Sequence, residues 1–175
     1  MNGLGHCVGA SLFPAAQFDE QDLFVEITSV IAQMENWMVF VNDLMSFYKE
    51  FDDPRDQTSL VNNYCQCEGI SLNQALDKLT RDTIHCSEQI FSVFEGKDGQ
   101  IRATLEAFIH GYVTWHLCDA RYRLEEVSKR AGDSPAGMKF SQYTEMARKV
   151  GGVDPGEWAF PSVATLVEQR VSIEN

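Results

Sequence analysis

Apolar residues recur at three- and four-residue spacing along most of the chain, which is the pattern of buried helices. The first run extends from Gln21 to about Phe51, and its apolar positions cover more than one stripe. We therefore expect a long helix that is enclosed on several sides. Asp19 and Asp22 are suited to cap its start, because carboxylates stabilise a helix N-terminus. Asp52-Asp53-Pro54 ends the run, since proline disfavours helix in the residue before it.

The same pattern predicts three further helices. One opens at Ser71 and breaks at the glycines of 96–99, a second covers about 100–130, and a short one lies near 141–150. Residues 1–20 read as small and irregular. Because no segment shows sustained strand alternation, the predicted fold class is all-α, with helices too long for a small bundle.

Composition narrows the class of protein. A chain of 175 residues has the length of one domain and can bury a sizeable core. Its net charge of −12 argues against a nucleic-acid partner, which needs a basic surface. There is no apolar run of about 18 residues, so no membrane span is expected, and the N-terminus lacks a signal-peptide pattern, which favours a cytoplasmic location. The odd number of cysteines, without zinc-like spacing, favours free thiols.

Three polar residues of the first predicted helix carry the first candidate chemistry. Asn42, Ser46 and Glu50 stand at i, i+4 and i+8, which places them on one helix face. An amide oxygen, a hydroxyl and a carboxylate are hard donors that suit Mg²⁺ and leave positions for water and phosphate. Zinc would require His or Cys, and this face has neither. A solvated polar face explains the same spacing, but the flanking apolar residues favour a bound group.

A second constellation lies near the end of the predicted helix 100–130. The run Asp119-Ala-Arg-Tyr-Arg contains two guanidinium groups and a phenol. Guanidinium groups make bidentate, charge-assisted hydrogen bonds, so this run suits a diphosphate. The alternative is a charged helix end whose arginines pair with Glu125 or Glu126 on the helix surface.

The chain resembles a known family at both places. The pattern N-D-x-x-S-x-x-x-E is similar to the second metal-binding motif of class I terpene cyclases, with Asn42, Ser46 and Glu50 at its ligand positions. Longer runs at 41–53 and 110–119 are similar to sesquiterpene cyclases of that family, and the similarity continues through 157–159. The resemblance implies the class I terpenoid synthase fold, in which long antiparallel helices surround a central cavity. This chain would be the C-terminal portion of that single catalytic domain, with the N-terminal helices missing.

The resemblance also implies a reaction, a cofactor and residue roles. The reaction is Mg²⁺-dependent ionisation and cyclisation of farnesyl diphosphate with release of diphosphate. Arg121 and Tyr122 correspond to the catalytic Arg-Tyr pair that holds the departing diphosphate, and Lys49 is a further candidate ligand. The family members that this chain resembles most have a basic residue at the position of Ala120, so local positive charge is lower here. A homodimer is a further expectation from the family.

Aromatic residues and histidines near these motifs allow two interpretations. Tyr112 and Trp115 are candidate substrate-binding residues, because aromatic faces stabilise carbocations. Phe40, Phe47 and Phe108 are weaker candidates of the same kind. Ordinary core packing explains most aromatics at helical spacing equally well. The two histidines of the predicted helix 100–130, at positions 110 and 116, are interpreted as satisfied core residues.

Asp52 to Asp56 fits the pattern D-D-x-x-D but directly follows the Asn/Ser/Glu motif and contains Pro54. We interpret it as a helix stop and exposed loop. The aspartate-rich motif of the family lies on a different, earlier helix, which this chain lacks. The 175 residues alone are therefore expected to have little or no cyclase activity and to expose apolar helix faces. The alternative is a noncatalytic helical remnant that binds a partner chain or nothing.

Overall fold

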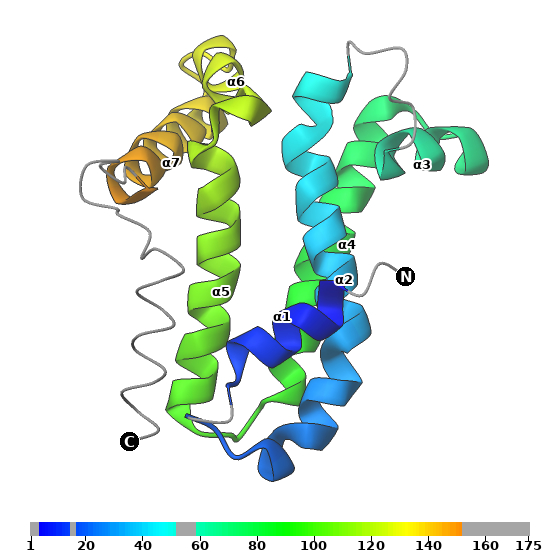
Figure 1. Ribbon diagram of the computed structural model, residues 1–175. Coiled ribbons are helices and arrows are strands. Elements are labelled where there is room, and N and C mark those ends of the chain that lie inside the picture. Colours follow the sequence, from blue (N-terminus) through cyan, green and yellow to red (C-terminus); the bar gives the residue numbers. More distant parts are fainter. Residues whose placement is uncertain (1–3, 15–16, 52–58, 152–175) are drawn as a thin grey trace, which may run out of the picture.

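The computed structural model describes residues 4–14, 17–51 and 59–151, and every regular element in these ranges is helical (Figure 1). This confirms the predicted all-α class. None of the described helices is long and apolar enough to cross a membrane. The elements are α1 (Leu4–Leu12), α2 (Glu20–Glu50), α3 (Leu60–Glu68), α4 (Leu72–Val93), α5 (Gly99–Cys118), the 3₁₀ turn η1 (Ala120–Tyr122), α6 (Leu124–Arg130) and α7 (Pro135–Gly151).

The three longest helices begin at side-chain caps. Asp19 Oδ1 accepts a hydrogen bond from the backbone N–H of Gln21 at 2.9 Å, which confirms one of the two caps predicted for α2. Ser71 and Gln74 form a reciprocal capping box at the start of α4, so this predicted start is also confirmed. Asp98 caps α5 in the same way as Asp19 caps α2.

Helix α2 is the centre of the packing. No side chain between 37 and 50 is exposed, whereas Phe24 and Val25 in its N-terminal half are each 68% exposed. The predicted enclosure therefore holds only for the C-terminal half. The main core lies between α2 and its neighbours α1, α4 and α5, and its buried members are Phe13, Leu23, Val30, Met34, Trp37, Met38, Val41, Cys86, Ile90, Phe94, Ile101 and Leu105.

The directions of the helices bring two distant segments together. Helices α2 and α5 run the same way, and α4, which packs on α2, runs the opposite way, so the C-terminal ends of α2 and α5 lie at one end of the molecule (Figure 1). Helix α2 contacts α5 and also η1, which follows α5. The C-terminal ends of helices carry the negative pole of the helix dipole, so this end favours cations.

The prediction of one continuous helix over 100–130 is wrong, because α5 ends at Cys118 and a separate helix, α6, covers Leu124–Arg130. The carboxylate of Asp119 accepts a hydrogen bond from the backbone N–H of Arg121 at 2.9 Å, and this bond caps the start of the 3₁₀ turn. Arg123 then adopts the left-handed conformation, with φ 56°, and separates η1 from α6. The spacing of apolar residues does not reveal this break, because apolar positions continue across it.

Three other boundaries differ from the prediction. Helix α1 lies within residues 1–20, for which the sequence predicts irregular structure, and α3 occupies a segment for which the sequence pattern predicts no helix. Helix α7 begins at Pro135, not near 141, and proline is well tolerated in the first turn of a helix. The run from Asp52 to Asp56, predicted to be a loop, lies outside the described residues, as does 157–159.

Candidate active site

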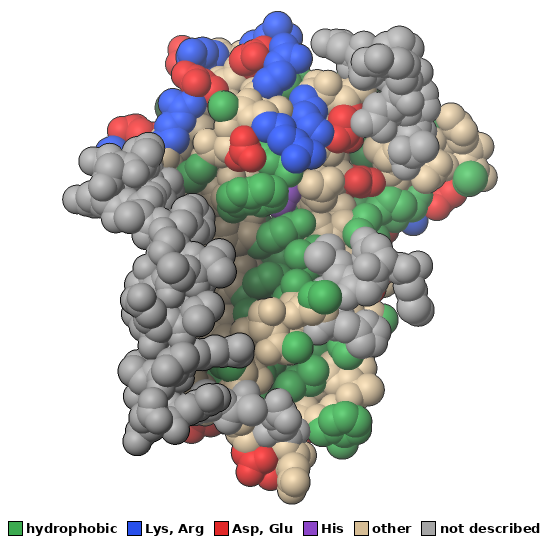
Figure 2. Space-filling model, in the orientation of Figure 1, with side chains coloured by type: hydrophobic (Ala, Val, Ile, Leu, Met, Phe, Trp, Pro, Cys, Tyr) green, Lys and Arg blue, Asp and Glu red, His purple; other side chains and the backbone are tan. Residues whose placement is uncertain are grey.

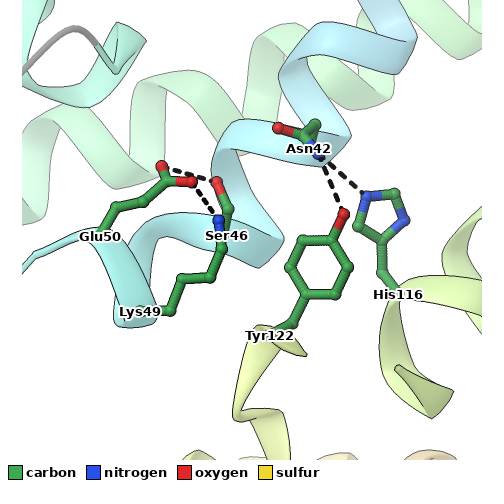
Figure 3. A network of polar contacts seen from close by, with 6 residues as sticks. All are labelled: Asn42, Ser46, Lys49, Glu50, His116 and Tyr122. Atoms are coloured by element: carbon green, nitrogen blue, oxygen red, sulfur yellow. Dashed lines mark hydrogen bonds and ion pairs between the residues drawn. The ribbon is translucent and has the colours of Figure 1, made fainter. Parts of the chain in front are cut away.

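The predicted metal motif lies on one face of the last turns of α2. Ser46 is completely buried, and its hydroxyl donates to Glu50 Oε2 at 2.8 Å. The ammonium of Lys49 donates to the other oxygen of Glu50, whose side chain is only 19% exposed. A solvated polar face would leave these groups in water, so the burial argues against that alternative. Figure 3 shows Asn42 one turn earlier on the same side of the helix.

Asn42 connects this motif to α5 and η1. Its side-chain nitrogen Nδ2 lies 3.3 Å from the phenol oxygen of Tyr122 and 3.4 Å from Nε2 of His116. Its carbonyl oxygen points away from these two residues, to the side on which Ser46 and Glu50 lie (Figure 3). The amide therefore presents its one metal-ligating atom towards the other two predicted ligands.

The protonation of His116 follows from its neighbours. Nδ1 lies 2.8 Å from the backbone carbonyl of Tyr112, and a carbonyl can only accept, so Nδ1 carries a proton. Complete burial lowers the pKa of His116, which favours the neutral ring and leaves Nε2 as an acceptor for Asn42. The prediction of a satisfied core histidine is thus confirmed for His116. It is wrong for His110, which is exposed because six residues along a helix lead to a different face.

Two cations flank the ring of the buried Tyr122. The Lys49 ammonium lies 5.4 Å from the ring centroid and the Arg121 guanidinium lies 5.3 Å from it. Arg121 is exposed and has no ion pair among the residues that the structure describes. Arg123, in contrast, makes a two-pronged contact with Glu126, with distances of 2.9 and 2.8 Å. The surface pairing considered as an alternative therefore applies to Arg123 and not to Arg121.

Aromatic rings continue from this point along α5. Tyr112 donates to the backbone carbonyl of Met38 at 3.3 Å, and burial, followed by the proximity of Tyr122, raises the pKa of Tyr112. Trp115 lies between them, with its ring centroid 6.1 Å from that of Tyr112 and 5.7 Å from that of Tyr122. The candidates Tyr112 and Trp115 therefore adjoin the Arg-Tyr pair, and their binding of substrate remains a prediction.

The weaker aromatic candidates separate into two groups. Phe108 packs beside Trp37 and Tyr112, on the side of α2 that faces α5. Phe47 packs in the smaller core with residues of α3 and α4, and Phe40 packs against both this core and the main one, so ordinary core packing explains them. Helical spacing predicts that all three phenylalanines point inward. Only the packing of α3 and α4 on α2 shows which core each of them joins.

The donor set at the end of α2 fits Mg²⁺. Among the described residues, no group of three or more His, Cys, Asp or Glu side chains is arranged to hold a metal. Asn42, Ser46 and Glu50 offer three oxygen donors of different types, as a hard divalent cation prefers. Lys49 shows that Glu50 already attracts a cation at this position.

On the face that Figure 2 shows, the described residues form a furrow between α5 and α2. Figure 2 shows hydrophobic side chains along the furrow between α5 and α2, with charged side chains gathered at the end where α6 lies. Cavities of about 410 and 460 Å³ lie instead near the connection between α4 and α5. A third, of about 240 Å³, lies beside the break after α5 and is lined by residues that include Asp119 and Arg123. None of these three is lined by the metal motif.

The sequence pattern that describes trichodiene synthase matches residues 1–174. The chain belongs to the trichodiene synthase family. It is 62% identical over 176 residues to a trichodiene synthase of Stachybotrys chartarum, an alignment that covers 99% of this chain and 46% of the relative. The trichodiene synthases of Fusarium poae and Fusarium sporotrichioides are 62% and 60% identical over 172 residues, and these alignments cover 97% of this chain and 46% of each relative. The chain thus spans about half the length of the curated trichodiene synthases that it matches.

Sequence reasoning missed two residues of this candidate site. Asp119 was included in the charged run, but its capping of η1 was not predicted, although aspartate commonly caps such turns. His116 was predicted to be satisfied, but its contact with Asn42 was not, because the two are 74 residues apart. Only the packing of α5 on α2 reveals this second relationship.

Proposed function

We propose that this chain is the C-terminal portion of the catalytic domain of a sesquiterpene cyclase that converts farnesyl diphosphate to trichodiene and releases diphosphate. The observation that carries the proposal is the contact between Asn42 and Tyr122, which joins the Asn/Ser/Glu motif to the Arg-Tyr pair. The similarity to proteins named trichodiene synthase supports the choice of substrate and product.

The chemical difficulty is to break an allylic C–O bond so that negative charge collects on the departing diphosphate. Arg121 and Lys49 both supply positive charge close to the Tyr122 ring, and the phenol supplies a hydroxyl donor. Donors that are already in place where charge develops stabilise a transition state strongly. Mg²⁺ held by Asn42, Ser46 and Glu50 would neutralise a further part of this charge.

Lys49 changes partners in this account. It is bonded to Glu50 in the structure, and Glu50 also accepts from the buried hydroxyl of Ser46. Glu50 has to turn its oxygens from both donors in order to act as a metal ligand. Lys49 is then free to bind diphosphate on the side where the ring of Tyr122 and the guanidinium of Arg121 already lie.

The aromatic faces of Tyr112 and Trp115 are suited to stabilise the carbocation that remains after ionisation. A carbocation also needs a site that excludes water. Because Trp115 is 49% exposed and the furrow is open, we propose that the 175 residues alone have little or no cyclase activity. Further helices would then cover the furrow, and measurable product from the isolated chain would contradict this.

The alternative of a noncatalytic helical remnant that binds a partner has one observation in its favour. Large apolar side chains are exposed on several helices: Phe24, Val25, Phe51, Ile84, Trp115, Met138, Tyr143 and Met146. Exposed apolar surface commonly marks a surface that another chain or segment covers. The homodimer and the cytoplasmic location also remain predictions.

The test is product formation by the complete natural protein with farnesyl diphosphate and Mg²⁺, followed by gas chromatography and mass spectrometry. We expect trichodiene, and we expect Glu50→Gln to reduce its formation by about a hundredfold or more, as for other groups that stabilise a developing charge. Glu106→Gln, a change of the same kind on the surface of α5, is the matched control and should retain activity. Unchanged activity in Glu50→Gln would refute the metal role of Glu50. A product other than trichodiene would refute the predicted product but not the metal role.

A further inference from the structure

The orientation of the Asn42 amide decides whether this residue can bind a metal. An amide has one end that can ligate a cation, the oxygen, and one end that cannot, the NH₂ group. Nδ2 lies 3.3 Å from the Tyr122 phenol oxygen and 3.4 Å from His116 Nε2, and the oxygen lies on the side of Ser46 and Glu50 (Figure 3). Something in the protein must hold the amide this way round.

Tyr122 alone does not fix this orientation. A phenol hydroxyl both donates and accepts, so it would bond equally well to either end of the amide. His116 has no such freedom, because its Nδ1 proton is used by the backbone carbonyl of Tyr112 at 2.8 Å. The ring is completely buried among three aromatic rings, which favours its neutral form, so with Nδ1 protonated Nε2 can only accept. If the amide were reversed, the oxygen of Asn42 would face this lone pair, and two acceptors would oppose each other.

The ring of His116 is itself held firmly. It is completely buried, and its centroid lies 4.6 Å from those of Tyr112 and Tyr122 and 4.7 Å from that of Trp115. Three aromatic rings and one backbone hydrogen bond therefore fix the position of Nε2. A fixed acceptor selects one orientation of its partner, as groups behind a metal ligand commonly do.

We propose that His116 is a positioning residue that holds the Asn42 amide with its oxygen towards Ser46 and Glu50. The proposal rests on the proposed metal site, and His116 itself touches no metal in it. Through this one hydrogen bond, α5 would control the geometry of a ligand on α2.

The test measures metal affinity and not turnover. Mn²⁺ is titrated into the complete natural protein with inorganic pyrophosphate present, and bound ion is followed by the loss of the free-ion EPR signal. His116→Leu should weaken Mn²⁺ binding about tenfold or more, the usual effect of removing a group that orients a ligand. His116→Gln, whose side-chain oxygen can accept from Asn42, should restore part of the affinity. The matched control is His110→Leu, an exposed position on the same helix, which should bind as the wild type does.

A double-mutant cycle separates this proposal from the metal site on which it rests. In an Asn42→Ala background, His116→Leu should have no further effect on Mn²⁺ affinity. Wild-type affinity in His116→Leu, or a full further loss in the Asn42→Ala background, would overturn the positioning role. If Asn42→Ala itself leaves the affinity unchanged, the metal site is wrong and the positioning role falls with it. Circular dichroism identifies a misfolded His116→Leu, in which case the less disruptive His116→Gln decides: affinity no better than that of Asn42→Ala would contradict the proposal.

Discussion

The amide nitrogen of Asn42 lies 3.3 Å from the phenol oxygen of Tyr122, which is 80 residues further along the chain. Asn42 belongs to the predicted metal motif and Tyr122 to the predicted diphosphate pair, so this contact makes the two motifs one site. The cause is the path of the chain, since α2 and α5 run the same way and end at the same end of the molecule (Figure 1). A site with both groups can hold a cation and the anion that the cation neutralises.

The turn after α5 should depend on the Asp119 carboxylate. Asp119→Ala removes the acceptor for the Arg121 N–H, so the free energy of unfolding should fall by about 1 kcal/mol, as for other caps. It should also weaken the binding of inorganic pyrophosphate, since Arg121 and Tyr122 lie in that turn. Calorimetry of the complete natural protein measures both effects.

Asp98→Ala is the matched control, because Asp98 caps the start of α5 with the same geometry at the other end of the helix. It should cost similar stability and leave pyrophosphate affinity unchanged. Equal losses of affinity in Asp98→Ala and Asp119→Ala would show that the turn has no specific role.

Much of the metal motif was predictable because it depends on the helical repeat alone. Asn42, Ser46 and Glu50 share a face in any α-helix, and burial on that face was indicated by the flanking apolar residues. The break after Cys118 was not predictable in the same way. It depends on one carboxylate capping a turn and on a left-handed Arg123, and neither interrupts the apolar pattern.

The partner of each site residue could not be predicted from the sequence. The arginines of the charged run looked equivalent, yet Arg123 pairs with Glu126 while Arg121 stands beside Tyr122. Their difference arises from the backbone conformation of the turn, which is a property of tertiary structure. The contact between His116 and Asn42 likewise depends on tertiary structure.

Two glycines provide a matched pair for stability. A Cβ atom at Gly137 would lie 2.5 Å from the backbone oxygen of Ala131, so Gly137→Ala should force α7 away from the end of α6 and destabilise the protein by about 1–3 kcal/mol. Gly111 lies on α5 with no atom close to the new methyl group. Gly111→Ala should therefore stabilise the helix by about 0.5–1 kcal/mol. Thermal unfolding measures both, and changes of the same sign would contradict this packing.

The thiol of Cys86 should be protected from alkylation. Burial raises its pKa, and the thiol donates to the backbone carbonyl of Gln33 at 3.0 Å. The thiolate is the reactive form, so iodoacetamide near pH 8 should modify the exposed Cys7 and Cys67 first. Cys86 should react only at higher pH or in denaturant. Peptide mass spectrometry gives the order, and reaction of Cys86 as fast as Cys67 would contradict its burial.

Glu125 should make stability depend on pH. Its carboxylate bonds to Lys129 at 2.8 Å and to Arg148 on α7 at 2.6 Å, and these two cations, Lys129 first, lower the pKa of Glu125 below its ordinary value of 4.5. Because the folded-state pKa is the lower one, the contribution is present above pH 4.5 and is lost as pH falls through the folded-state pKa. The effect should be small, since the groups are exposed and salt screens them.

The measurement for Glu125 is the melting temperature as a function of pH at low ionic strength. Below pH 4.5 the wild type should lose stability more steeply than Glu125→Gln, which lacks the titrating group. Curves of equal slope would show that the contact between α6 and α7 does not depend on this carboxylate.

The most direct test of the account is a crystal structure of the complete natural protein with Mg²⁺ and inorganic pyrophosphate. We expect a Mg²⁺ ion about 2.1 Å from oxygen atoms of Asn42, Ser46 and Glu50. We also expect pyrophosphate oxygens within hydrogen-bonding distance of Arg121 and Tyr122. An ion bound elsewhere, with Lys49 still bonded to Glu50 and pyrophosphate away from Arg121, would contradict the claim that the ends of α2 and α5 form one metal and diphosphate site.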